Sequence, residues 1–170
     1  MEQIKQYKPV KNLLSKGSTN SKTAKNDIKT FILYLAPHNL NVKNITLCKD
    51  ASKGCIESCL YSAGRGKFSN VQKSRINKAN YYVTDKKAFI KQLVFEIRKE
   101  IKKASDKNEK IAFRLNGTSD IDFLYLMSKY ENFDVELLHY DKVYFYDYTK
   151  SPIRALKYQL GKLPSNYHLT

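Results

Sequence analysis

Short apolar runs alternate with longer amphipathic segments from residue 29 to the end of the chain. Four of these runs have the composition and the spacing of buried strands: residues 30–36, 110–115, 143–148 and 166–170. Pro37 stops the first run, because proline cannot donate a hydrogen bond to a neighbouring strand. The alternating residues of the second run, such as Ile111 and Phe113, predict one strand face that is buried in a core.

Helices are expected between these strands. The clearest is residues 85–104, where a stripe of apolar residues recurs at helical spacing behind a capping Thr84 or Asp85. Weaker patterns predict further helices over residues 70–82, around residues 123–127, and over residues 154–159. Residues 135–138 are compatible with either a short strand or the end of a helix.

Strands that alternate with helices indicate parallel βα units. We therefore expect an α/β fold with a mainly parallel sheet of four or more strands flanked by helices, and a partial βα barrel is one form of it. Residues 29–170 should make a single α/β domain. Residues 1–28 are polar and rich in lysine, which predicts a basic arm that is mobile or loosely docked. Because the chain stops inside a predicted strand, we expect the natural polypeptide to continue beyond residue 170.

Polar residues recur where the predicted strands end. Cys48 follows the first strand, Asn116 and Asp120 follow the second, Asp147 ends the third, and His168 lies in the fourth. In parallel α/β folds, ligands bind at the carboxyl ends of the strands. The pattern therefore predicts one site that several strand ends build together.

Three polar residues at or next to the strand ends are unusual for buried strands. Arg114 and Asn116 alternate with Phe113 and so belong to the opposite strand face, where a polar group needs a partner. Asp147 is a carboxylate within an apolar strand, and we expect Arg114 or Lys150 to pair with it.

All three cysteines of the chain, Cys48, Cys55 and Cys59, lie within twelve residues in the pattern C-x6-C-x3-C. Cys55 and Cys59 would share one face of a helical turn. This grouping favours a [4Fe-4S] cluster with one open iron that can take a small molecule. A zinc ion is the alternative, with a fourth ligand from one of four residues: His38, Asp50, His139 or His168. The remaining interpretation is that the three cysteines are reduced thiols that bind no metal.

A glycine-rich basic segment follows the cysteines directly. Gly64 and Gly66 would let backbone N–H groups turn inward, and Arg65 adds a positive charge, so this segment could hold a phosphate or carboxylate. An ordinary flexible turn is the alternative. Gly117, after the second strand, would permit close approach of the backbone to a ligand, while residues 118–120 could instead cap the next helix.

The formal net charge of the 170-residue chain is +15, from 31 basic and 16 acidic residues. Such an excess favours contact with DNA or RNA, although much of the lysine could equally be solvated surface. The chain has no apolar run near its start, which predicts neither a secretory signal nor a membrane span. An odd number of cysteines argues against a disulfide framework and favours the cytoplasm.

Several blocks resemble a bacteriophage family called gene product 88. They include residues 51–66, which hold Cys55 and Cys59, and then residues 114–120, 146–152 and 166–170. The resemblance covers about residues 30–170 and implies a phage or prophage protein that acts in the host cell. It implies no activity. A looser likeness is to radical S-adenosylmethionine enzymes, whose three cysteines also follow the first strand of a partial βα barrel, with the different spacing C-x3-C-x2-C.

These observations predict a protein with an iron–sulfur cluster on Cys48, Cys55 and Cys59. By the looser likeness, it would cleave S-adenosylmethionine reductively to act on an unidentified substrate. The expected ligand contacts come from the glycine-rich segment and the strand ends: Gly64, Arg65, Gly66, Asn116, Gly117, Asp120, Asp147 and His168. The alternative is a metal-stabilised basic protein that binds DNA or RNA without catalysis, through its arm and the helix at residues 85–104. Whether the protein is an enzyme, and its oligomeric state, stay open.

Overall fold

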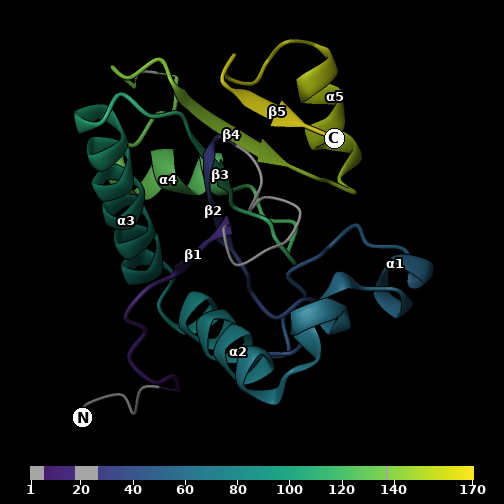
Figure 1. The fold of residues 1–170 in the computed structure, drawn as a ribbon. Coiled ribbons are helices and arrows are strands. Elements are labelled where there is room, and N and C mark those ends of the chain that lie inside the picture. Colours follow the sequence, from purple (N-terminus) through teal and green to yellow (C-terminus); the bar gives the residue numbers. More distant parts are fainter. Residues whose placement is uncertain (1–5, 18–26, 137) are drawn as a thin grey trace.

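A five-stranded sheet organises the protein, and the computed structural model describes residues 6–17, 27–136 and 138–170 of it (Figure 1). The strands lie in the order in which they occur in the chain: β1 (Leu14–Lys16), β2 (Lys29–Leu33), β3 (Ile111–Arg114), β4 (Val143–Asp147) and β5 (Tyr167–Leu169). β1 pairs with β2 in the antiparallel sense, and every other neighbouring pair is parallel. The expected α/β fold with a mainly parallel sheet is confirmed.

The sheet is not closed into a barrel, so the partial-barrel form of the prediction is wrong. Its two edges are β1 and β5, which do not pair with each other. A parallel βα barrel closes with eight strands, and the five strands described here form an open sheet.

Five helices and two short 3-10 turns connect the strands within the described residues. They are α1 (Lys53–Glu57), η2 (Leu60–Ser62), η3 (Gly64–Lys67), α2 (Ser69–Thr84), α3 (Lys86–Asp106), α4 (Phe123–Glu131) and α5 (Pro152–Gln159). The expected helices are all present. Residues 135, 136 and 138 belong to neither a strand nor a helix, and residue 137 lies outside the described residues.

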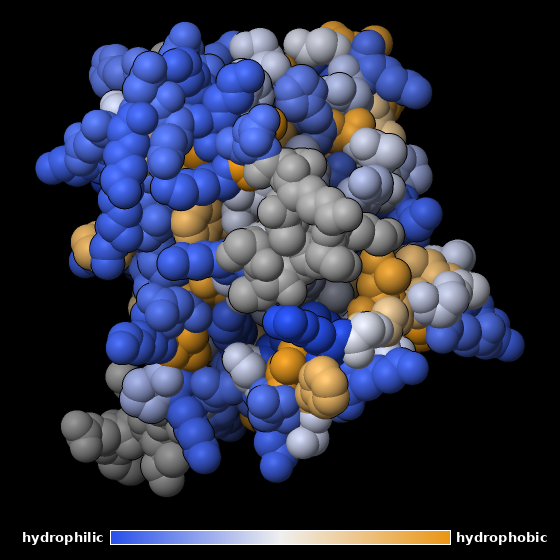
Figure 2. All heavy atoms as spheres, in the orientation of Figure 1, coloured by the Kyte–Doolittle hydropathy of each residue, from blue (hydrophilic) through white to orange (hydrophobic). Residues whose placement is uncertain are grey.

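One face of the sheet forms the core with the helices. Phe113 stacks between Phe31 of β2 and Phe145 of β4, with ring centroids 5.8 and 5.2 Å away. The predicted stripe of α3 is buried in the same core, and its Leu93 and Ile97 are 0% exposed. The Asp85 side chain accepts a hydrogen bond from the Ala88 N–H and caps α3, as expected. Hydrophilic side chains cover the outer side of α3 (Figure 2).

The part of the predicted arm that the structure describes, residues 6–17, docks on the core. Leu13 is fully buried, and the Glu96 carboxylate of α3 accepts hydrogen bonds from the Leu13 and Leu14 N–H groups at 2.8 and 2.9 Å. Lys78 of α2 donates to the Leu13 carbonyl at 2.7 Å. Strand β1 was therefore missing from the sequence prediction. Residues 1–5 and 18–26 of the arm lie outside the described residues.

Candidate functional site

The turn that follows β3 joins the carboxyl ends of the central strands. The Gly117 N–H donates to the Leu33 carbonyl at 3.0 Å, and the Thr118 hydroxyl donates to the Leu35 carbonyl at 2.6 Å. The Asp120 N–H donates to the carbonyl of Leu47, the residue before Cys48, at 2.8 Å. The structure thus brings the start of the cysteine segment to the same sheet edge as the predicted polar residues.

Asp147 and Asn116 form a buried pair at this edge. The Asn116 backbone N–H and side-chain amide donate to the Asp147 carboxylate at 2.7 and 3.0 Å, and the Tyr167 hydroxyl donates at 3.0 Å. Burial raises the pKa of Asp147 to about 6, although these hydrogen bonds and nearby Arg154 oppose the rise.

The expected pairing of Asp147 with Arg114 or Lys150 is wrong. Asp147 shares its face of β4 with the core residue Phe145, whereas Arg114 projects from the opposite face of the sheet. The cation nearest to the Asp147 carboxylate is Arg154 of α5, at 4.0 Å.

Arg154 links the two acidic residues of the site and was not predicted from the sequence. It forms an ion pair with Asp120 and donates to the Tyr167 hydroxyl at 2.7 Å. Asp120 also accepts hydrogen bonds from the Thr149 hydroxyl and the Lys150 N–H, at 2.9 and 2.7 Å. These contacts tie the ends of β3, β4 and β5 together, so much of the hydrogen-bonding capacity of Asp120 and Asp147 is used within the protein. A ligand-binding role for them stays a prediction.

The first of the three thiols, Cys48, lies at this same edge. Cys48 is half-buried, and its sulfur lies 3.9 Å from the Thr118 carbonyl oxygen. Burial raises the pKa of Cys48, the His38 backbone lowers it, and the negative charges of Cys59, Asp120 and Cys55 raise it further.

The spacing of Cys55 and Cys59 predicts that they share one face of a helix, and this prediction is wrong. Cys55 lies in α1, which ends at Glu57, and Cys59 precedes η2 in an extended backbone conformation. All three cysteines are free thiols. Among the described residues, no three cysteine, histidine, aspartate or glutamate side chains are already arranged to hold a metal ion.

Arg75 of α2 lies beside the cysteine segment and was not predicted as a site residue. Its guanidinium lies 4.6 Å from the centre of the Tyr34 ring and 5.6 Å from that of Tyr61, and it donates to the Tyr61 carbonyl at 3.0 Å. Its Nε is buried without a hydrogen-bond partner, and no carboxylate in the described residues pairs with it. Burial lowers the pKa of Arg75, while Tyr34, Tyr61 and Cys59 favour its charged form.

A second buried nitrogen without a partner lies close to Cys48. His38 Nε2 makes no hydrogen bond, and the His38 backbone carries a positive φ of 53°. The His38 carbonyl accepts from the Leu47 N–H at 3.1 Å, and the His38 backbone also bonds to the Cys48 thiol. These backbone contacts place His38 beside the first cysteine. Asp50, another of the four predicted zinc ligands, follows Cys48 by two residues and is exposed.

The glycines have structural explanations. Gly64 has a φ of +52°, a conformation that favours glycine. A Cβ on Gly66 would lie 2.1 Å from the Tyr61 carbonyl oxygen, and one on Gly117 would lie 2.6 Å from the Tyr34 ring. Arg65 is exposed. Anion binding by residues 64–66 and ligand contact by Gly117 stay predictions.

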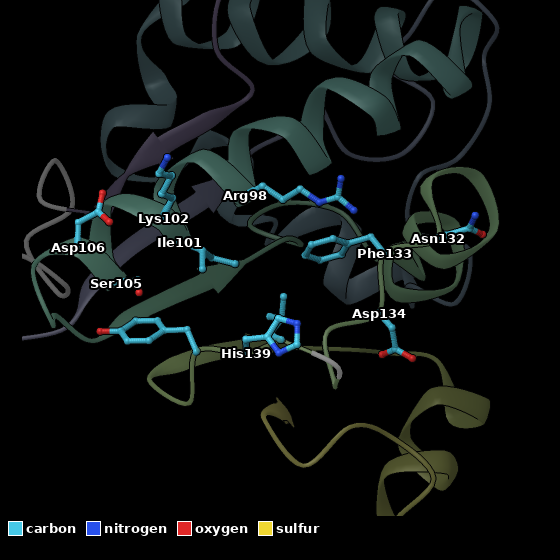
Figure 3. A pocket seen from close by; sticks show the side chains of 11 residues that line it. Arg98, Ile101, Lys102, Ser105, Asp106, Asn132, Phe133, Asp134 and His139 are labelled. Carbon is cyan, nitrogen blue, oxygen red and sulfur yellow. The ribbon is translucent and has the colours of Figure 1, made fainter.

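Two cavities lie on opposite sides of the fold. A cavity of about 250 Å³ borders the site and is lined in part by Leu47, Lys49, Lys86 and Asp120. A larger one of about 450 Å³ lies between α3 and the segment that leads into β4, where Arg98 and His139 point toward it (Figure 3). This places His139 away from the cysteines, near the amino ends of the parallel strands, while His168 is exposed on β5.

The fold and the strand-end site define an α/β protein with a mostly parallel open sheet and a cysteine segment at its carboxyl edge. The chain belongs to the gene product 88 family of bacteriophage proteins, whose family profile matches residues 11–170 and so includes all three cysteines. Searches of curated proteins and of solved structures found no match. In the part of the chain that the structure describes, no helix combines the length and apolarity that crossing a membrane requires.

Proposed function

We propose that Cys48, Cys55 and Cys59 bind an iron–sulfur cluster of the [4Fe-4S] type. The observation that carries the proposal is the buried guanidinium of Arg75, which contacts Tyr61 beside Cys59 and has no carboxylate partner among the described residues. The Tyr34 and Tyr61 rings and the Tyr61 carbonyl offset part of the cost of burying this cation, and a nearby negative charge would offset more of it. Three thiolates around a cluster would supply that charge, since thiolate is the form of cysteine that binds metal.

The cysteine segment can rearrange to close a ligand set. α1 has no buried residue, and the neighbouring Ile56 and Leu60 are 46% and 64% exposed. Little apolar burial therefore holds Cys55 and Cys59 in their present positions. Cys48, in contrast, follows Leu47, which is buried and hydrogen-bonded to the turn after β3. The fixed thiol would anchor the cluster, and the other two would close on it.

Three cysteine ligands leave one iron open for a small molecule, and we propose S-adenosylmethionine in that position. A bound cluster would supply an electron to cleave it. The protein would hold the ligand with the backbone of residues 64–66 and with polar atoms at the sheet edge, from Asn116 to Asp120 and near Asp147. His168, which was also expected to contact the ligand, pairs with Tyr146 and so lies on the other face of the sheet from Asp147. The reaction would take place in the cytoplasm of the phage host.

A zinc ion is the second candidate, and His38 favours it. Its buried, unpartnered Nε2 could complete a ligand set of three thiolates and one imidazole, which is a common structural zinc site. Such a site would stabilise the cysteine segment and would have no open position. Metal analysis separates the two candidates directly.

The test is purification without oxygen, followed by iron, sulfide and zinc analysis. An iron–sulfur cluster predicts about four iron atoms and four sulfides per chain, with an absorption band near 400 nm. Cys55→Ser should lose both, while Ser58→Ala, a change in the same segment that leaves every thiol in place, should keep them. One zinc per chain that is lost in His38→Ala would replace the cluster by the second candidate. A folded protein that takes up neither metal would refute both.

Arg75 provides an independent check of the cluster. Arg75→Gln removes the positive charge beside the thiols and should shift the midpoint potential of the cluster to a more negative value, because the reduced cluster carries more negative charge. An unchanged potential would show that Arg75 is not the counter-ion. Circular dichroism of the variant would establish that it folds.

A further inference from the structure

Among the described residues, the sheet face opposite the core carries one arginine and several aromatic rings but no acidic residue. Along the four parallel strands this face contains Thr30, Ile32, Ala112, Arg114, Tyr144, Tyr146 and His168. The first three are buried, so its accessible part consists of Arg114, the tyrosines and His168. The strand register places Arg114 beside Ile32, and Tyr146 beside His168. Tyr34 and Tyr148 follow at the carboxyl ends of β2 and β4. We call the surface formed by Arg114, His168 and the four tyrosines Tyr34, Tyr144, Tyr146 and Tyr148 the tyrosine face.

Arg114 is the central cation of the tyrosine face. Its Nε is buried without a partner, and its Nη2 makes only a long 3.5 Å hydrogen bond to the Gly117 carbonyl. No carboxylate of the described residues forms an ion pair with it. A guanidinium with free donors and no acid is suited to bind a phosphate, whose oxygen atoms match its fork of N–H groups.

The tyrosines around Arg114 keep part of their rings accessible. Tyr148 is 55% exposed, and the Arg114 guanidinium lies 4.9 Å from the centre of its ring. Tyr34, Tyr144 and Tyr146 are half-buried. Burial raises the pKa of Tyr146, while the positive charge of Arg114 opposes the rise. Half-buried rings beside a cation on a sheet are the arrangement on which unpaired bases stack.

We propose that the tyrosine face binds single-stranded DNA or RNA, with bases stacked on the tyrosines and a phosphate on Arg114. The net charge of +15 supports a polyanionic ligand. A duplex fits poorly, because its bases are already stacked and cannot reach half-buried rings. This surface differs from the lysine-rich arm and the residue 85–104 helix that the sequence suggested, and it contains none of the cysteines.

The experiment measures fluorescence anisotropy of labelled 20-nucleotide oligo-dT, oligo-rU and a duplex of the same length, at 50 and 200 mM NaCl. The full chain should bind either single strand more tightly than the duplex and lose affinity as salt rises. Tyr148→Ala should weaken single-strand binding about 5- to 100-fold. Arg114→Gln should weaken it and reduce the slope of log K against log salt by about 0.7.

Two control variants make the outcome decisive. Arg98→Gln removes the same charge from an exposed position on α3, beside Phe133, and should change single-strand affinity little compared with Arg114→Gln. Cys55→Ser should bind like the unmodified chain, so that failure of the cluster and failure of this proposal remain distinguishable. The proposal is overturned if the full chain binds no single strand at 50 mM NaCl. It is equally overturned if Tyr148→Ala binds normally, or if the duplex binds as tightly as the single strands.

Discussion

Replacing Asp147 by asparagine should change how stability depends on pH. Asp147 is only 2% exposed, and burial raises its pKa from the ordinary value of 3.8 to about 6. The folded protein therefore holds this proton more tightly than the unfolded chain does. Stability from this group is fully present below about pH 4 and is lost as the pH rises through 6. The shift corresponds to about 3 kcal/mol in the free energy of unfolding.

The assay is urea unfolding, followed by circular dichroism, between pH 3.5 and 7.5 for the unmodified chain and Asp147→Asn. The asparagine cannot ionise, and its amide group faces donors from Asn116 and Tyr167, so the variant carries a fixed loss of stability at every pH. The difference between the two proteins isolates the titration. On this reasoning the unmodified chain loses about 3 kcal/mol relative to the variant between pH 3.5 and 7.5.

A difference that stays flat, or that grows in favour of the unmodified chain as the pH rises, would refute this reasoning. It would mean that the donors around Asp147, with Arg154, outweigh burial and keep the carboxylate ionised. Asp106→Asn is the matched control, because it removes the same charge from an exposed position at the end of α3. The steep change seen with Asp147→Asn should be absent there.

Two further substitutions test how segments are held on the core. Glu96→Ala removes the acceptor for the Leu13 N–H, so it should lower the free energy of unfolding by about 2 kcal/mol and speed amide exchange in β1. Glu96→Gln keeps an acceptor and should lower it less. Equal effects of the two substitutions would contradict the role of Glu96 as the acceptor. Gly66→Ala places a Cβ 2.1 Å from the Tyr61 carbonyl oxygen and should force the segment from Tyr61 to Gly66 to shift. A thiol reagent should then modify Cys59 faster than in the unmodified chain. An unchanged rate would show that the segment accommodates the methyl group.

The elements that could be predicted from the sequence are those with a local pattern. The stripe of α3 and the alternation in β3 and β4 are readable because burial repeats at the period of the element itself. β1 has no such repeat: Leu13 and Leu14 are an isolated apolar pair, and their backbone is satisfied by Glu96, a side chain about eighty residues away in the sequence. That contact exists only once the tertiary fold has formed.

The candidate site was predictable in its place but not in its contacts. The rule that parallel strands end at one edge correctly brought Asn116, Asp120 and Asp147 together. Their shared partner Arg154 lies on a later helix, and nothing in its local sequence distinguishes it from a solvated arginine. The same holds for Arg75, whose buried surroundings come from Tyr34 and Tyr61, on separate segments.

The neighbouring strands β2 and β3 are far apart in the sequence, since β2 ends at Leu33 and β3 begins at Ile111. The segment between β2 and β3 contains the three cysteines and helices α1 to α3. Closing a loop of this length costs about 4 kcal/mol in chain entropy. The stretch from β3 to β5 needs only short closures. The carboxyl-terminal half should thus nucleate folding, and β2 with β1 should join late, after α2 and α3 have formed.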